Sequence, residues 1–318
     1  MQTLIIINNS AAKAKRVWPL IEQQLNDAGI PFERYETKAA GDASIKARNA
    51  LHSGTTTVAV VGGDGTLSEA AEGFFEFNND LAQPPRPINP DAALAILPAG
   101  TGDDFARGMQ GKRATLSPSI ELLLSHLREP NAMAIDVLYG RSDAYQTPFI
   151  CLNASTMGIG GETARRVLAQ GSFMRRFSGE FRFAFAAVGA LGAWRERRVS
   201  VVVDGREFFD GPMNLTAVAN GLYAGGGMML SPAASIEDGL LDVLTASGLT
   251  RLGIVRELAR IHNGGHLRNP KVKLERGRLV RIETFMAHDA MPIEADGNLR
   301  GVTPVQFEVL PRALKFVM

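Results

Sequence analysis

One short segment limits the folds open to this chain more than any other. The apolar run from Val58 to Val61 passes directly into Gly62-Gly63-Asp64-Gly65-Thr66, where a helical pattern begins. Glycines permit positive φ angles and let backbone N–H groups approach a ligand with no Cβ between them. The helix that follows adds unpaired N–H groups and a partial positive charge. The turn therefore predicts a phosphate-binding site.

Asp64 lies inside this predicted anion site, where a bare carboxylate would repel a phosphate. A Mg²⁺ ion between the two groups would remove the repulsion, because Mg²⁺ prefers hard oxygen ligands. The T-x-x-E spacing of Thr66 and Glu69 also fits a capping box, which would give Glu69 a purely structural role. Both interpretations stay open for Glu69, whereas the three glycines favour phosphate binding for the turn as a whole.

Strand and helix patterns alternate through the first 127 residues. The strand patterns cover residues 3–8, 31–36, 57–61 and 92–97, and the helical patterns cover residues 14–28, 42–52 and 117–127. Such alternation predicts a parallel sheet covered by helices, in which ligands bind at the carboxyl ends of the strands. A second glycine loop, Gly100-Thr101-Gly102-Asp103-Asp104, follows the fourth strand. It predicts a shared nucleotide site, and one of its aspartates is expected to cap the next helix.

After about residue 132, short strands separated by turns rich in Gly, Asp or Asn predominate. They cover residues 134–139, 149–153, 199–203, 214–219, 241–246, 271–275, 279–283 and 305–310. One helix is expected at residues 251–262, where Leu252, Val255, Leu258 and Ala259 recur at helical spacing. The pattern predicts an antiparallel sheet or sandwich. The expected fold class is therefore α/β in the first part of the chain and all-β in the second.

Composition excludes several classes of protein. Among 318 residues, 34 Lys plus Arg face 33 Asp plus Glu, and a dedicated nucleic-acid binder would carry a basic excess. Cys151 is the only cysteine, so no intramolecular disulfide can form. The first apolar run has no basic residue before it and is expected to be a strand, not a signal peptide. The apolar run at residues 183–194 is too short to span a bilayer. A cytoplasmic protein without a nucleic-acid partner is expected.

In these motifs the chain resembles the diacylglycerol kinase catalytic-domain family, and within it the bacterial soluble lipid kinases of the YegS type. Besides the glycine loops, Ala219-Asn220-Gly221, Glu237-Asp238-Gly239 and Glu294-Ala295-Asp296-Gly297 occur in the same order along nearly the whole chain. The resemblance implies an NAD-kinase-like nucleotide-binding domain at residues 1–134 and a β-sandwich lipid-binding domain at residues 135–304. It also implies a tail, residues 305–318, that returns to the first domain.

The activity implied by this resemblance is transfer of the ATP γ-phosphoryl group to a lipid hydroxyl, with Mg²⁺ as cofactor. Diacylglycerol and phosphatidylglycerol are candidate substrates, which would place the chain in phospholipid metabolism. The residues that would contact the nucleotide are Asn8, Thr37, Gly62, Gly63, Asp64, Gly65, Thr66, Glu69, Gly100 and Thr101. Asp64 would also serve the catalytic Mg²⁺, and Asp104 belongs to the second essential loop.

Ser235, Asp238 and Leu240 fall on a loop that, by the same resemblance, would hold a structural Mg²⁺ ion, with backbone carbonyls sharing the ligation. A tight Asp-Gly turn between two strands explains this loop equally well. The family's late motif reads Asp-Gly-Glu, with the glutamate as proton acceptor, but Asn298 stands at that place and cannot accept a proton. Asp296 is therefore the candidate catalytic carboxylate, and a plain hairpin turn is the alternative.

Two other functions stay open. An NAD kinase shares the Gly-Gly-Asp-Gly loop, and Asn298 is compatible with an inactive protein that only binds a nucleotide or lipid. Residues 165–198 contain eight arginines and two glutamates, interleaved with phenylalanines, which suits the surface of an anionic membrane. A core helix with solvated arginine ends is the alternative. We expect peripheral contact with the inner membrane face, with a homodimer as one candidate assembly.

Overall fold

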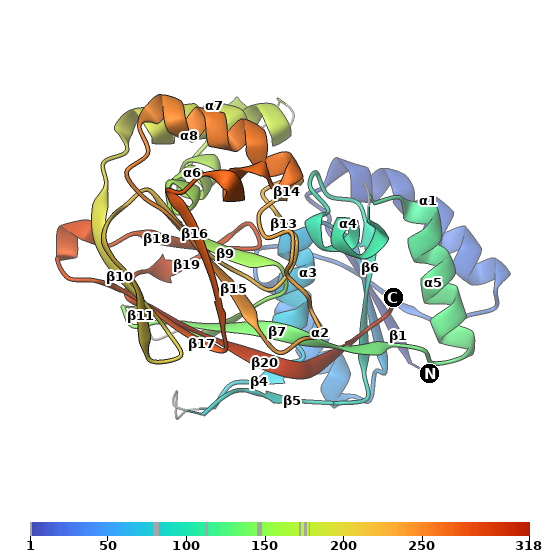
Figure 1. The fold of residues 1–318 in the computed structure, drawn as a ribbon. Coiled ribbons are helices and arrows are strands. Elements are labelled where there is room, and N and C mark those ends of the chain that lie inside the picture. Colours follow the sequence, from blue (N-terminus) through green and yellow to red (C-terminus); the bar gives the residue numbers. More distant parts are fainter. Residues whose placement is uncertain are drawn as a thin grey trace. The chain divides into compact units, whose positions relative to one another are not determined.

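The computed structural model describes residues 2–78, 83–111, 114–144, 148–171, 173–174, 177 and 179–318 (Figure 1). The chain divides into two compact units. Unit 1 comprises Met1–Val137 with Leu310–Met318, and unit 2 comprises Leu138–Val309. The chain enters unit 2 within strand β7 (Met133–Ser142) and returns to unit 1 within strand β20 (Val305–Phe316). The domain limits expected at residues 134 and 304 stay predictions.

Unit 1 is built on a parallel sheet. Its strands are β1 (Thr3–Ile7), β2 (Glu33–Glu36), β3 (Thr57–Gly62), β6 (Ala93–Pro98) and the end of β20. They lie in the order β2-β1-β3-β6-β20, and every neighbouring pair is parallel. All residues of β1, β3 and β6 are buried, which accounts for their continuous apolar sequences, because helices cover both faces of such a sheet. The predicted parallel sheet is confirmed.

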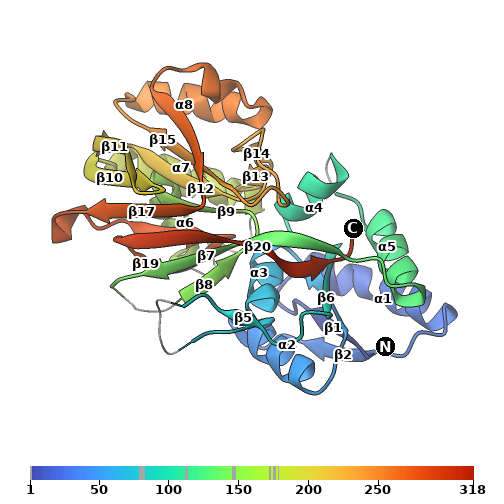
Figure 2. The same ribbon diagram turned by 60° about the horizontal axis from the view of Figure 1, so that its bottom comes forward.

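Helices cover the two faces of this sheet (Figure 2). Helices α1 (Ala12–Asp27) and α5 (Leu116–Arg128) share one apolar core with alternate residues of β1, β3 and β6. Helices α2 (Asp42–His52) and α3 (Asp64–Glu72) pack together, α2 against β1 and α3 against β3. The short elements of unit 1 are α4 (Asp104–Gln110), β4 (Phe75–Glu76) and β5 (Arg86–Pro87).

Unit 2 consists of two antiparallel sheets around one apolar core. The first sheet has the order β16-β15-β12-β9-β18-β19, and the second contains β11-β10-β17-β20 together with β7 and β8. Both sheets contribute buried side chains to the same core, for example Val201 and Ile282 from one and Val243 and Ile293 from the other. The strands are β8 (Pro148–Cys151), β9 (Ala154–Gly158), β10 (Arg197–Val203), β11 (Arg206–Met213), β12 (Leu215–Ala219), β15 (Leu241–Ala246), β16 (Val272–Gly277), β17 (Leu279–Thr284), β18 (Pro292–Ala295) and β19 (Asn298–Val302). The expected sandwich is confirmed.

Among its described residues, unit 2 contains three α-helices, although only one was expected from the sequence pattern. They are α6 (Ile159–Leu168), α7 (Gly179–Ala193) and α8 (Arg251–Arg260), and shorter elements are η2 (Ile261–Asn263), η3 (Gly265–Arg268), η4 (Ala287–Asp289) and the hairpin β13 (Tyr223–Ala224) with β14 (Met228–Met229). Helix α8 confirms the expected helix, but its periodic apolar side chains point outward: Leu252 and Val255 are exposed, whereas Ile254 and Glu257 are buried. Within the described residues, no helix is long and apolar enough to cross a bilayer.

Candidate nucleotide site and family membership

The candidate nucleotide site lies where the strand order of unit 1 reverses. After β1 the chain forms α1 on one face of the sheet, and after the neighbouring strand β3 it forms α3 on the other. In open α/β sheets, ligands bind outside the carboxyl ends of strands at such a reversal. All ten residues expected to contact a nucleotide, together with Asp104, belong to unit 1. They follow or flank the carboxyl ends of β1, β2, β3 and β6.

Two glycine loops contact each other at this edge of the sheet. A Cβ atom added to Gly63 would lie 2.9 Å from the Cα atom of Gly100, and one added to Gly100 would lie 2.5 Å from the Cα atom of Gly63. Neither glycine has a positive φ, nor does Gly62. Positive φ angles are therefore not the reason for glycine at these three positions. Gly63 and Gly100 are needed because any side chain would separate the two backbones.

Polar side chains join the loops after β1 and β2 to helix α3. Asn8 donates from Nδ2 to Thr66 Oγ1 at 2.8 Å, and the Asn9 N–H donates to Thr37 Oγ1 at 3.3 Å. Glu69 accepts from the Gly41 N–H at 3.0 Å. Helix α3 begins at Asp64 with no side-chain cap, so Thr66 lies inside the helix and the capping-box interpretation was wrong. Glu69 instead fixes the loop before α2.

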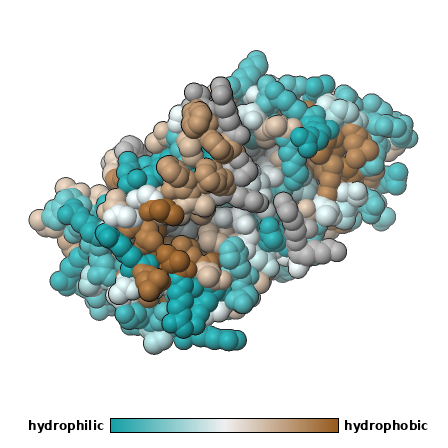
Figure 3. Space-filling view, turned by 90° about the horizontal axis from the view of Figure 1, so that it is seen from above, coloured by the Kyte–Doolittle hydropathy of each residue, from teal (hydrophilic) through white to brown (hydrophobic). Residues whose placement is uncertain are grey.

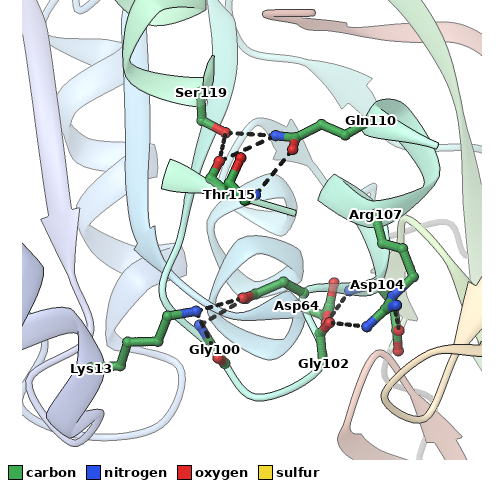
Figure 4. A network of polar contacts seen from close by, with 10 residues as sticks. Lys13, Asp64, Gly100, Gly102, Asp104, Arg107, Gln110, Thr115 and Ser119 are labelled. Atoms are coloured by element: carbon green, nitrogen blue, oxygen red, sulfur yellow. Dashed lines mark hydrogen bonds and ion pairs between the residues drawn. The ribbon is translucent and has the colours of Figure 1, made fainter. Parts of the chain in front are cut away.

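Asp64 caps a different helix from the one it begins. Its Oδ2 accepts from the Asp104 N–H at 2.9 Å (Figure 4). Its Oδ1 accepts from the Phe105 N–H, also at 2.9 Å. Asp103 stands at the N-cap position of α4 but directs Oδ1 back to the Gly100 N–H, at 2.7 Å. Asp103 is therefore the N-cap residue of α4, as expected for one of these aspartates, but its side chain does not form the capping hydrogen bond. The first glycine loop provides the cap, which ties the two loops together.

Lys13 is a functional candidate that sequence reasoning missed. From the first turn of α1, its Nζ donates to Asp103 Oδ2 at 3.1 Å and to the Gly100 carbonyl oxygen at 3.3 Å. The lysine side chain is half exposed, whereas the Asp103 side chain is buried. The only signal in the sequence was a lysine shortly after the first strand, and such residues are common. Lys13 becomes a candidate only through its contact with Asp103, which lies 90 residues further along the chain.

The remaining charges at this edge come from Asp104 and Arg107. Asp104 is buried, and its Oδ1 lies 3.9 Å from Arg107 Nε, while Thr101 is exposed. Among the described residues, no group of three or more His, Cys, Asp or Glu side chains is arranged to hold a metal ion. A nucleotide-associated Mg²⁺ needs fewer, because it uses one or two carboxylates plus phosphates and waters. Asp64 fits that requirement, since each carboxylate oxygen can accept more than one contact.

Asp296 belongs to unit 2, on the turn between β18 and β19. It is buried, and its carboxylate accepts from three successive backbone N–H groups: Leu152 at 2.7 Å, Asn153 at 3.1 Å and Ala154 at 3.2 Å. Asn298 begins β19 opposite Ala295. Glu294 accepts from Thr156 Oγ1 at 2.6 Å and from the Gly297 N–H at 2.6 Å. The proposed catalytic role of Asp296 stays a prediction, and its observed contacts hold the start of β9.

The loop that carries Ser235, Asp238 and Leu240 also lies in unit 2. Asp238 accepts from the Leu240 N–H at 3.1 Å and forms an ion pair with Arg276, and Ser235 Oγ accepts from the Glu237 N–H at 3.3 Å. The arginine already occupies the carboxylate that would ligate a metal ion. A Mg²⁺ ligated by Asp238 would therefore lie beside a guanidinium, and the expected structural Mg²⁺ site stays a prediction.

Comparison with known proteins agrees with both units. Residues 2–138 match the diacylglycerol kinase catalytic domain, and residues 156–318, about half of the chain, match the YegS C-terminal NAD kinase beta sandwich-like domain. The chain belongs to the YegS and diacylglycerol kinase family. This membership confirms the resemblance and accounts for the order of motifs along the chain.

Relatives of this family member cover most of its length. A diacylglycerol kinase of Staphylococcus carnosus (strain TM300) is 28% identical over 95% of this chain and 90% of its own. A protein named probable lipid kinase YegS-like, from Xanthomonas campestris pv. campestris (strain 8004), is 31% identical over 71% of this chain and 67% of its own. The crystal structure of a diacylglycerol kinase from Bacillus anthracis str. Sterne has a TM-score of 0.67 at 20% identity, covering 99% of this chain and 96% of that one. The fold is therefore that of these kinases.

Proposed function

We propose that this chain is a lipid kinase that transfers the γ-phosphoryl group of ATP to a lipid hydroxyl in the presence of Mg²⁺. Membership of the family indicates a lipid kinase. The observation that carries the assignment of ATP is the contact between Gly63 and Gly100, which brings the glycine loops after β3 and β6 together beside the strand-order reversal of unit 1. Loops of this kind place backbone N–H groups against phosphates with no side chain between.

Phosphoryl transfer requires little covalent chemistry from the protein. The lipid hydroxyl oxygen forms a bond to the γ-phosphorus while the bond from that phosphorus to the β–γ bridging oxygen breaks, and ADP leaves with the electron pair. Catalysis then depends on positioning and on neutralising the phosphate oxygens. Lys13 and Arg107 are two cations in contact with the second glycine loop that could serve that purpose. A bound Mg²⁺, held through Asp64, would supply the remaining positive charge.

The lipid hydroxyl must also lose its proton during the transfer. Asn298 has no basic atom, and the Asp296 carboxylate is occupied by three N–H donors. We propose that Asp296 positions residues 152–154, with the proton lost late in the transfer to solvent or to the phosphate. A loose transition state makes a strong base less important.

An NAD kinase is the second candidate, because it shares the Gly-Gly-Asp-Gly loop. A surface on unit 2 favours a lipid instead. The outward face of α7 exposes Phe181, Phe185 and Val188, at 50%, 60% and 71% of their surface. Leu252 on α8 is 78% exposed, and Arg251 joins the two helices by donating to the Gly192 carbonyl oxygen at 2.9 Å. Figure 3 shows apolar residues gathered over this end of unit 2.

We propose that this α7–α8 surface contacts an anionic bilayer. Arg195, Arg251 and Arg256 are exposed on or beside the two helices, whereas Glu162 and Glu257 are buried and paired with arginines. Arginines around an apolar ridge give the combination of charge attraction and apolar burial that interfacial helices use. Of the segment 165–198, residues 172, 175, 176 and 178 lie outside the described part of the chain, Arg175 and Arg176 among them. The homodimer stays a prediction.

A labelled-phosphate assay tests the proposed function. The purified full chain receives γ-labelled ATP and Mg²⁺ with vesicles that contain diacylglycerol, phosphatidylglycerol or sphingoid bases, and separately with NAD. We expect label in a lipid product. Label in NAD would overturn the proposal and indicate an NAD kinase. ATP binding with no transfer to any acceptor would also overturn it and indicate an inactive binding protein.

A further inference from the structure

The loop between Ser231 and Asp242 in unit 2 is built around an arginine. Arg276 on β16 lies directly opposite Asp242 on β15 in the antiparallel pair. Its Nε contacts Asp242 Oδ1 at 2.7 Å, and its Nη2 forms an ion pair with Asp238 Oδ2. One guanidinium therefore joins a strand residue to the turn that precedes the strand.

The other oxygens of the two carboxylates are also occupied. Asp242 is 1% exposed and accepts through Oδ2 from Ser231 Oγ, while Asp238 Oδ1 accepts from the Leu240 N–H at 3.1 Å. A buried carboxylate needs a partner of opposite charge together with hydrogen bonds, and Asp242 has both. The hydrogen bonds that Arg276 donates to Asp242 and then to Asp238 raise the pKa of Arg276 above its usual value, so the guanidinium stays charged.

We propose that Arg276 is the permanent cation of this loop and that the loop binds no divalent ion. A Mg²⁺ ligated by Asp238 would have to share that carboxylate with the guanidinium, against charge repulsion. Mg²⁺ also demands near-ideal octahedral geometry, and both oxygens of the second carboxylate nearby already accept hydrogen bonds from Arg276 and Ser231. This differs from the structural Mg²⁺ that the family resemblance implies, and it does not involve the Mg²⁺ that accompanies ATP.

Thermal unfolding of the nucleotide-free full chain tests the proposal. We expect the Tm of the wild type to be the same in EDTA and in excess Mg²⁺. Arg276→Met should lower the Tm by several degrees, because it leaves a buried carboxylate unpaired. Arg278→Met, at an exposed arginine two residues further on, is the matched control and should leave the Tm unchanged.

Two results would overturn the proposal. One is a rise of the wild-type Tm on addition of Mg²⁺ that Asp238→Asn abolishes. The other is an Arg276→Met variant as stable as the wild type. If Arg276→Met does not fold, electron paramagnetic resonance of Mn²⁺ bound to the wild type gives the answer: we expect Asp238→Asn to leave the number of bound ions unchanged, and loss of one ion would refute the inference. None of these readouts depends on kinase activity.

Discussion

Asp64 at the start of α3 and Asp296 on the turn between β18 and β19 both adjoin a glycine, and both direct their carboxylates at backbone N–H groups. Asp64 caps α4 through the Asp104 and Phe105 N–H groups, and Asp296 holds three successive N–H groups before and at the start of β9. Each carboxylate thereby joins segments that are distant in sequence. A carboxylate beside a glycine is easily interpreted as catalytic, but each of these two stabilises the backbone of a segment distant in sequence.

Replacing Asp296 tests this at the residue scale. Asp296→Asn puts an amide NH₂ group against N–H donors in a buried place, so we expect a loss of about 3 kcal/mol in the free energy of unfolding. Chemical denaturation measures it. The control is Asp204→Asn, on a similar turn with positive φ where the carboxylate also accepts from two N–H groups but is exposed, and it should cost under about 1 kcal/mol.

A variant Asp296→Asn with unchanged stability and no phosphoryl transfer would contradict this account. It would show that the carboxylate acts on the substrate and not on the backbone of residues 152–154.

Lys13 provides a second test at this scale. Its ammonium group lies on the second glycine loop through Gly100 and Asp103, where we propose that phosphates bind. Removing one charged hydrogen bond should cost about 1.5 kcal/mol, so Lys13→Met should raise the KM for ATP about tenfold. Lys15→Met, an exposed lysine on the same helix, should leave that KM unchanged. Equal KM values for the two variants would remove Lys13 from the site.

At the scale of single elements, the outward faces of α7 and α8 are the feature that local patterns could least explain. A periodic apolar stripe such as the one on α8 normally predicts the buried side of a helix. Here the buried side of α8 carries Ile254 and Glu257. Helix α6 was not expected at all, because its fit depends on Gly161, where a Cβ atom would lie 2.1 Å from the Pro292 carbonyl oxygen. That neighbour is 131 residues away in the chain, so no local signal reveals it.

The α7 face should control membrane binding. The double variant Phe185→Ser with Val188→Ser removes two exposed apolar side chains, and losing their burial in lipid should weaken binding about tenfold or more. Flotation with phosphatidylglycerol vesicles measures it, and phosphatidylcholine vesicles should bind the wild type more weakly. Ile45→Ser, at an isoleucine 62% exposed in unit 1, is the control. Equal flotation of the double variant and the wild type would exclude this face.

His126 on helix α5 should make the free energy of unfolding depend on pH. His126 is buried, and burial lowers its pKa below the unfolded value of about 6.5. Its contribution to stability is complete above pH 6.5 and is lost as the pH falls below that value, because the unfolded chain then binds a proton that the folded ring resists. In His126→Gln, the free energy of unfolding should fall less steeply with decreasing pH than in the wild type. The two slopes should differ by at most about 1.4 kcal/mol per pH unit.

Denaturant titrations at several pH values between about 5 and 7.5 measure this slope, in the range where His normally titrates. The exposed His52 serves for the matched variant His52→Gln, which should keep the wild-type slope. His266 of unit 2 has its pKa lowered by burial too, so part of the slope should survive in His126→Gln. An unchanged slope in His126→Gln would show that its burial has no part in acid sensitivity.

At the scale of the whole molecule, the chain forms unit 1 from both of its ends. Leu314, Phe316 and Val317 are buried in unit 1, and β20 continues its parallel sheet beside β6. Alternating patterns were enough to predict the sheet and four of its helices, because local apolar periodicity and the glycines at element ends indicate each of these elements. The contacts that make a site are not local: Lys13 with Asp103, Asp64 with the N-terminus of α4, and Arg276 with Asp238 each join residues at least 38 positions apart.

The most direct test of the central claim is the binding of ATP with Mg²⁺ by isothermal titration calorimetry, for the wild type and for Gly63→Ala. A methyl group on Gly63 would lie 2.9 Å from the Gly100 backbone, so the two loops could no longer contact each other. We predict that the wild type binds ATP and that Gly63→Ala binds at least about tenfold more weakly while its circular dichroism spectrum is unchanged. A wild type that takes up no ATP, or a Gly63→Ala variant that binds it equally well, would contradict the account.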